Sequence, residues 1–233
     1  MQPLTQQSEP VVRKEPSPRR RTALWLAALS SVALASWGAF KWNPITDLSS
    51  PENWAAAGIN DAWDRGEVVV LIRHAERCDR SDAPCLATEE GITVNGSLVA
   101  SDAGAGIAAL GLHNADLQVS PSLRTRQTAH AMFGEDVADV EWLQGCDDQF
   151  AASVIAHKRE GRNLVAVTHS GCMDHFQRTM GIPSAQRDTP YAGAMFVTVV
   201  PGDTPDNDPY DHTRLLGMME ADDWPVLAQV VKR

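Results

Sequence analysis

The sequence lacks the local patterns on which several kinds of functional site depend. It has no glycine-rich nucleotide-binding loop, no Cys-x-x-Cys pair of the kind that binds zinc, and no serine elbow of the hydrolase type. Outside the motifs described below, the histidines show no metal-ligand spacing; they are His113, His130, His157, His175 and His212. We therefore expect neither a metal site nor a cofactor, and we interpret these histidines as surface or packing residues.

Positive charge is also scarce in most of the chain. The formal net charge of the 233 residues is -10, although residues 1–21 carry five basic side chains and only two acidic ones. The remaining residues therefore hold a net charge of about -13, which is a poor basis for wrapping nucleic acid. Any anion-binding site must be a local pocket rather than a basic face.

The first 40 residues differ in composition from the rest. Residues 1–21 are polar, proline-containing and basic, which predicts a disordered tail on the cytoplasmic side. Residues 22–40 carry no charge and are just long enough to cross a bilayer as a helix. This segment is either a retained transmembrane anchor, with Trp37 and Trp42 at the far interface, or a signal peptide cleaved near Ala33-Leu34-Ala35. We favour the anchor; a buried core helix is the third alternative.

Residues 41–66 are expected to form a linker that carries a short helix near Trp54 to Trp63. From residue 67 to residue 233, apolar runs alternate with helical patterns in a βαβα order. This order predicts an α/β fold, a three-layer sandwich with a mainly parallel central sheet and helices on both faces. The chain thus divides into a basic tail, an anchor or signal segment, a linker and one catalytic domain.

The most informative stretch is the first strand of that domain. Five apolar residues, mostly β-branched, run from Val68 to Ile72 and end in Arg73 and His74. Such a run is typical of a buried strand in a parallel sheet. Ligands bind at the carboxyl ends of the strands in open α/β sheets, so this pair predicts an anion site beside a potential nucleophile.

Two further strand ends supply matching side chains. The segment after the predicted strand 117–119 opens a helix with Pro121, and Arg124 falls in its first turn. The N-terminus of that helix also favours an anion. The predicted strand 163–168 is followed directly by His169. Parallel strands end at one edge of a sheet, so we expect these groups to converge there with the first Arg-His pair.

These motifs resemble the signatures of the histidine phosphatase superfamily, which has the phosphoglycerate-mutase-like fold. The match covers roughly residues 67–179 and rests on Arg-His-Ala-Glu, on Ser-Pro-Ser-Leu-Arg-Thr-Arg-Gln-Thr and on His-Ser-Gly. The resemblance implies that His74 attacks phosphorus and becomes a phosphohistidine. It also implies that Arg73, Arg124 and His169 hold the phosphoryl oxygens, and that small residues such as Ser170 let the backbone approach the phosphate.

A general acid is still needed to protonate the leaving alkoxide. In the superfamily a Glu after the next strand usually serves, but Gln144 falls near that position and cannot donate a proton usefully. Asp148, which we slightly favour, or Asp147 could substitute, unless both merely cap the following helix. Glu76 is a weaker candidate.

The four cysteines are Cys78, Cys85, Cys146 and Cys172. An even number in an exported domain suggests disulfides, and three pairings are available. We favour Cys78–Cys85, which closes the loop after His74, together with Cys146–Cys172, which joins two strand-end loops at the rim of the site.

The segment 68–96, with its Arg-Cys-Asp-Arg-Ser and Gly-Ile-Thr-Val-Asn-Gly stretches, resembles the bacterial lipopolysaccharide core heptose(II)-phosphate phosphatases. The resemblance implies a periplasmic, membrane-tethered phosphomonoesterase that acts on a heptose phosphate of the lipopolysaccharide core, without a nucleic-acid partner. One alternative is a periplasmic phosphatase of broad specificity. The other is a phosphate-binding envelope protein without turnover, an interpretation that Gln144 favours.

Overall fold

The computed structural model describes residues 45–134, 137–200, 210 and 212–225. The expected tail and the expected membrane or signal segment, residues 1–40, lie outside these residues. Among the residues that are described, no helix has the length and apolar character needed to cross a bilayer.

A five-stranded sheet forms the centre of the domain, in the order β2-β3-β1-β4-β5. Its strands are β1 (Val68–Arg73), β2 (Ala115–Val119), β3 (Asn163–Thr168), β4 (Ala194–Val199) and β5 (Thr213–Met219). Strands β2, β3 and β1 pair in parallel, whereas β4 is antiparallel to both β1 and β5. The sheet is therefore mixed. The expected mainly parallel order holds for the three strands that carry the Arg-His, Ser-Pro and His-Ser-Gly motifs, and β4 is the exception.

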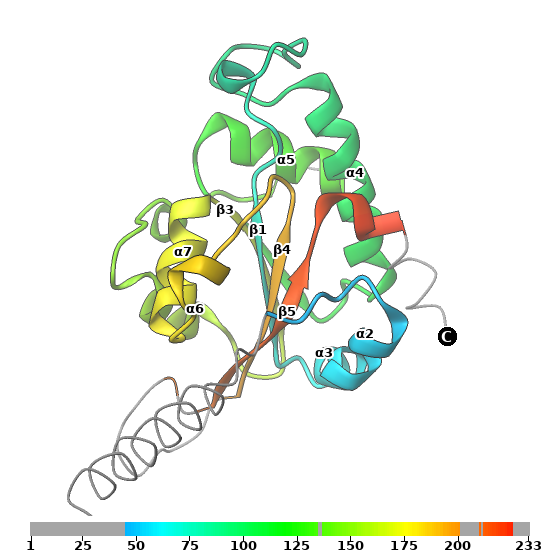
Figure 1. Cartoon of the computed structure of the whole chain (residues 1–233), viewed down its shortest axis with the longest axis vertical. Coiled ribbons are helices and arrows are strands. Elements are labelled where there is room, and N and C mark those ends of the chain that lie inside the picture. The colour runs from blue at the N-terminus through cyan, green and yellow to red at the C-terminus, as the bar shows by residue number, and fades with distance from the viewer. Residues whose placement is uncertain (1–44, 135–136, 201–209, 211, 226–233) are drawn as a thin grey trace, which may run out of the picture. The chain divides into compact units, whose positions relative to one another are not determined.

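Helices cover both faces of this sheet (Figure 1). The helices are α2 (Pro51–Ala57), α3 (Ile59–Asp64), α4 (Val94–Ala109), α5 (Leu123–Phe133), α6 (Phe150–His157) and α7 (Ser170–Thr179). Strand β1 shows why both faces need cover, because its side chains alternate between two buried clusters. Val68, Val70 and Ile72 join the cluster that includes residues of α2 to α5, while Val69 and Leu71 join the one that includes residues of α6 and α7.

The segment expected to be a linker contributes to the folded domain. Helices α2 and α3 lie within residues 41–66, and their Trp54 and Trp63 side chains are 2% and 1% exposed. Each indole N–H is satisfied, by Asn60 Oδ1 at 2.9 Å and by the carbonyl of Gly111 at 2.9 Å. These tryptophans bury large apolar surfaces beside β1, so the helices belong to the core.

The packing of α4 against α5 depends on a glycine. A Cβ atom added to Gly104 of α4 would stand 2.0 Å from the carbonyl oxygen of Met132 in α5, so only glycine permits this approach of the two backbones. Helix α5 carries Arg124 in its first turn. The glycine therefore helps to set the position of one of the predicted site residues.

Candidate active site

The strand ends that carry the predicted motifs meet at one edge of the sheet. Strands β1, β3 and β2 are neighbours and run in the same direction. His74 N donates to the carbonyl of Thr168 at 2.9 Å, and Ser120 N donates to the carbonyl of Val167 at 3.0 Å. The structure thus brings together Arg73 and His74 at the end of β1, Arg124 after β2, and His169 after β3, as the sequence predicts.

The ring of His74 is held in one tautomer. Its Nδ1 lies 2.8 Å from the carbonyl oxygen of Ala75. A carbonyl can only accept, so Nδ1 carries the proton and Nε2 presents an unprotonated lone pair. The peptide that follows is fixed in turn, because Ala75 N donates to Thr128 Oγ1 at 3.0 Å.

Burial keeps this imidazole neutral. His74 is 3% exposed, and its burial, with smaller contributions from His169, Arg124 and Arg73, lowers its pKa to about 3. At neutral pH the ring is therefore an uncharged base with one free nitrogen. The rings of His74 and His169 stand edge to face, with their centroids 5.5 Å apart.

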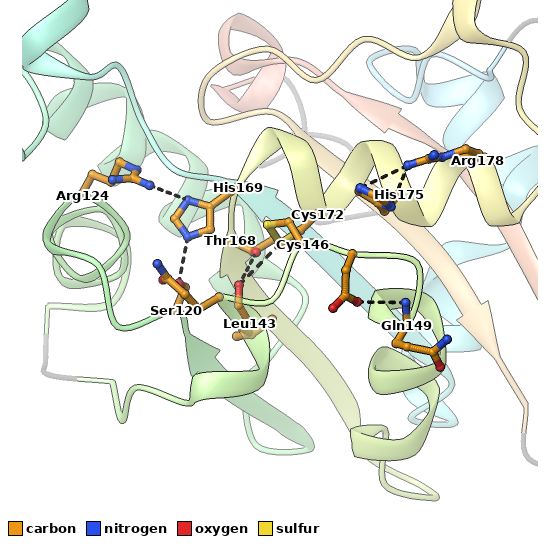
Figure 2. The surroundings of a disulfide bond; sticks show 12 residues. Ser120, Arg124, Leu143, Cys146, Gln149, Thr168, His169, Cys172, His175 and Arg178 are labelled. Atoms are coloured by element: carbon orange, nitrogen blue, oxygen red, sulfur yellow. Dashed lines mark hydrogen bonds between the residues drawn. A yellow bond between two sulfur atoms is a disulfide. The ribbon is translucent and has the colours of Figure 1, made fainter.

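His169 is the centre of a chain of hydrogen bonds that has one direction (Figure 2). Arg124 Nη2 lies 3.2 Å from His169 Nδ1, and a guanidinium can only donate, so Nδ1 accepts. His169 Nε2 therefore carries the proton and donates to Ser120 Oγ at 2.8 Å. The Ser120 hydroxyl in turn donates a hydrogen bond to Gln144 Oε1 at 2.7 Å. Burial and the charge of Arg124 lower the His169 pKa to about 4, so this ring is neutral as well.

Both predicted arginines have unused donors in the interior of the site. Arg73 Nη1 donates to the carbonyl of Thr189 at 2.6 Å, but the buried Nε atoms of Arg73 and Arg124 have no hydrogen-bond partner among the residues that the structure describes. Burial lowers the pKa of both guanidinium groups. Such donors are suited to bind an anion, and planar guanidinium groups match the oxygens of a phosphate. Ser170 begins α7 at the same edge, where the N-terminus of the helix also favours an anion.

The carboxylates predicted as general acids make contacts of their own. Asp147 Oδ1 accepts from Gln149 N at 2.9 Å, just before α6. Asp148 is 84% exposed at its side chain and lies 3.1 Å from His175 Nδ1, and Figure 2 shows that His175 points away from His169. Glu76 accepts from Thr93 Oγ1 at 2.8 Å. Their proposed acid role stays a prediction.

Two residues near the site were not found from the sequence. Arg77 forms an ion pair with Asp79, and its charge lowers the pKa values of Arg73, Arg124 and His169, so it lies close to all three. Tyr191 lies under the guanidinium of Arg73, with 3.7 Å between Cζ and the ring centroid. A lone Arg in a loop and a Tyr before an apolar strand offer no pattern that would have indicated either one.

Comparison of the chain with known proteins identifies the family to which it belongs. No family model matches the chain. The lipopolysaccharide core heptose(II)-phosphate phosphatase of Salmonella typhi is 33% identical over 164 residues, which are 69% of this chain and 78% of that protein. The Salmonella arizonae protein of the same name is 32% identical over 148 residues, 59% of this chain and 73% of its own length. The chain belongs to this phosphatase family. It is a histidine phosphatase, and the resemblance found in the sequence is confirmed.

A solved structure agrees on the fold. Phosphoserine phosphatase from Entamoeba histolytica, in complex with 3-phosphoglyceric acid, superposes with a TM-score of 0.51 at 14% identity. The superposition covers 67% of this chain and 98% of that one. At this level of identity the likeness concerns the fold alone.

Two disulfides brace the site in this phosphatase. Cys78 pairs with Cys85, and Cys146 pairs with Cys172, which is the pairing that we favoured from the sequence. The first closes the loop that follows His74. The second ties the segment that carries Gln144 to the first turn of α7, immediately after His169. Both therefore restrain backbone next to one of the two site histidines.

Proposed function

We propose that this phosphatase removes a phosphate from a heptose of the lipopolysaccharide core in the periplasm, through a phosphohistidine intermediate on His74. The observation that carries the proposal is the state of His74, a buried neutral ring with its Nδ1 proton held by the Ala75 carbonyl and its Nε2 lone pair free. The substrate class follows the names of the relatives.

In this mechanism Nε2 of His74 attacks phosphorus, and the bond from phosphorus to the sugar oxygen breaks. Arg73 and Arg124 pair with the phosphoryl oxygens through Nε donors that are unpaired within the described part of the chain, and they offset the charge of the transition state. His169, neutral and hydrogen-bonded to both Ser120 and Arg124, lies beside one of these arginines and holds its guanidinium in place. Water then attacks the phosphohistidine, releases phosphate and restores His74.

The periplasmic location is part of the proposal. Residues 22–40 would anchor the chain in the inner membrane with the arginines before them on the cytoplasmic side. Two disulfides beside the site support an oxidising compartment, because reducing conditions in the cytosol disfavour them. A fusion of the chain to alkaline phosphatase after residue 233 would be active in this topology. An inactive fusion that accumulates as a full-length protein would contradict it.

The function is tested by phosphate release from lipopolysaccharide core oligosaccharide that carries phosphoheptose, with chelator present. We expect release by the wild-type chain and none by His74→Ala, while His113→Ala, which changes an exposed histidine, keeps full activity. The same enzyme is offered glycerol phosphate and an aryl phosphate. Comparable kcat/KM for all substrates would indicate broad specificity instead, and binding of phosphate without turnover would contradict the proposal.

A further inference from the structure

The site as described lacks a group that can give a proton to the leaving oxygen. Gln144 is an amide, and the hydroxyl hydrogen of Ser120 is committed to it. Asp147 and Asp148 contact the backbone before α6 and a side chain of α7. An alkoxide leaves slowly unless it is protonated as the bond breaks, so a proton donor on the remaining wall of the site would complete the machinery.

Tyr191 stands on that wall. Its ring centroid is 3.7 Å from Arg73 Cζ and 5.7 Å from the centroid of the His74 ring. Arg73 and His74 are the last residue of β1 and the first residue after it, so the Tyr191 ring lies against both predicted site residues of that strand end. A phenol, which can both give and take a proton, therefore lies beside the nucleophile.

The backbone beside Tyr191 is held in a strained conformation by hydrogen bonds. Ala192 has a φ of 55°, in the left-handed region that a residue with a Cβ rarely adopts. Trp224 Nε1 donates to the Ala192 carbonyl at 3.0 Å, and this bond is buried. On the next residue, the Gly193 carbonyl accepts from Arg73 N at 3.0 Å. The turn is thus joined to the Arg73-His74 strand end, and strained backbone held by its surroundings is typical of functional positions.

We propose that Tyr191 is the general acid and base of the reaction, a step that rests on the proposed function. As Nε2 of His74 bonds to phosphorus, the phenol proton passes to the sugar oxygen, which leaves as an alcohol. The guanidinium of Arg73, which lies over the ring, offsets the negative charge that forms on Tyr191. The phenolate then takes a proton from the water that attacks the phosphohistidine, so phosphate leaves and Tyr191 regains its hydroxyl.

The test uses Tyr191→Phe in the full-length chain, which keeps the ring over Arg73 and removes only the hydroxyl. A sugar phosphate needs the proton, but an electron-poor phenolate such as 4-nitrophenolate leaves without one. We expect kcat/KM to fall roughly 100-fold or more for core oligosaccharide that carries phosphoheptose and by less than about 3-fold for 4-nitrophenyl phosphate. The hydrolysis of the intermediate also needs the base, so 4-nitrophenyl phosphate should give a burst of phenolate followed by slow turnover.

The two activities separate failure of this inference from failure of the proposed function. If the wild-type chain does not hydrolyse the core oligosaccharide, or does so no better than His74→Ala, the proposed function fails. If wild type is active and Tyr191→Phe changes kcat/KM equally for both substrates, the hydroxyl is not the acid. Loss selective for the sugar phosphate in Asp148→Asn, with Tyr191→Phe unaffected, would overturn the inference in favour of that carboxylate. Retained activity on the aryl phosphate shows that the variant is folded.

Discussion

The two buried histidines predict that the domain loses stability in mild acid. The pKa of His74 is lowered from 6.5 to about 3, and that of His169 to about 4. In the unfolded chain both titrate near 6.5. Below pH 6.5 the two histidines bind protons in the unfolded state but stay neutral in the folded state, so the free energy of unfolding falls as the pH falls. The contribution of the two neutral histidines to the free energy of unfolding is complete above pH 6.5 and is lost progressively toward pH 3.

The magnitude follows from the width of this interval. Each pH unit between the unfolded and folded pKa values is worth about 1.36 kcal/mol for each group. Lowering the pH from 7 to 5 therefore removes about 2 kcal/mol for His74 and about 2 kcal/mol for His169. Glu67, Asp79 and Asp116, which form ion pairs with arginines, also have lowered pKa values, but they titrate below this range. The histidines should thus account for about 4 kcal/mol, a large share of a typical stability of 5–15 kcal/mol.

The assay is urea unfolding at pH 7 and at pH 5, followed by the fluorescence of the buried tryptophans. Replacing His74 by Gln gives an uncharged polar side chain of similar length and removes one titrating ring. The loss between the two pH values should be about 2 kcal/mol smaller in His74→Gln than in wild type. His113→Gln, which changes an exposed ring, should lose as much as wild type. An equal loss in wild type and His74→Gln would refute the account of a buried neutral nucleophile.

Three further outcomes are expected. Arg124→Lys keeps the charge but loses the planar guanidinium group, so kcat/KM should fall roughly 10- to 100-fold. Arg126→Lys, two residues later on the same helix, should match wild type. Equal effects of the two changes would contradict the role of Arg124 in binding phosphate. Gly104→Ala should lower the free energy of unfolding by about 1–3 kcal/mol in chemical denaturation, because its Cβ meets the backbone of α5, and an unchanged value would contradict this packing. Joint replacement of Cys146 and Cys172 by Ser should cost about 3 kcal/mol in the same assay and lower kcat, and an enzyme indifferent to the change would show that the bond does not hold the site.

The parts of the site that follow parallel strands could be predicted from the sequence. Arg73, His74, Arg124 and His169 each stand at a fixed offset from an apolar run, and parallel strands deliver such residues to one edge. Local pattern and topology point to the same arrangement, so no long-range information was needed. The disulfide pairing followed from the same placement, because Cys78 and Cys85 both follow the end of β1, and Cys146 lies opposite Cys172 in the first turn of α7.

Tyr191 could not be found in this way because it precedes its strand. In a mainly parallel sheet, a residue before β4 would lie at the opposite edge from the site. Strand β4 runs antiparallel to β1, so its amino end meets the carboxyl end of β1 and brings Tyr191 to Arg73. The direction of a strand depends on the segment that connects it to the sheet and on its packing. A short apolar run predicts neither of them. The core roles of Trp54 and Trp63 were missed for a related reason, since their partners are distant in sequence.

The most direct test of the account is to locate the phosphoryl group during turnover. The wild-type chain is mixed with 4-nitrophenyl phosphate, quenched within milliseconds, digested and analysed by mass spectrometry at a pH that preserves phosphohistidine. We predict phosphate on His74, with an amount that rises in Tyr191→Phe because hydrolysis of the intermediate is slowed. A phosphoryl group on any other residue, or rapid turnover with no covalent intermediate in either chain, would contradict the central claim.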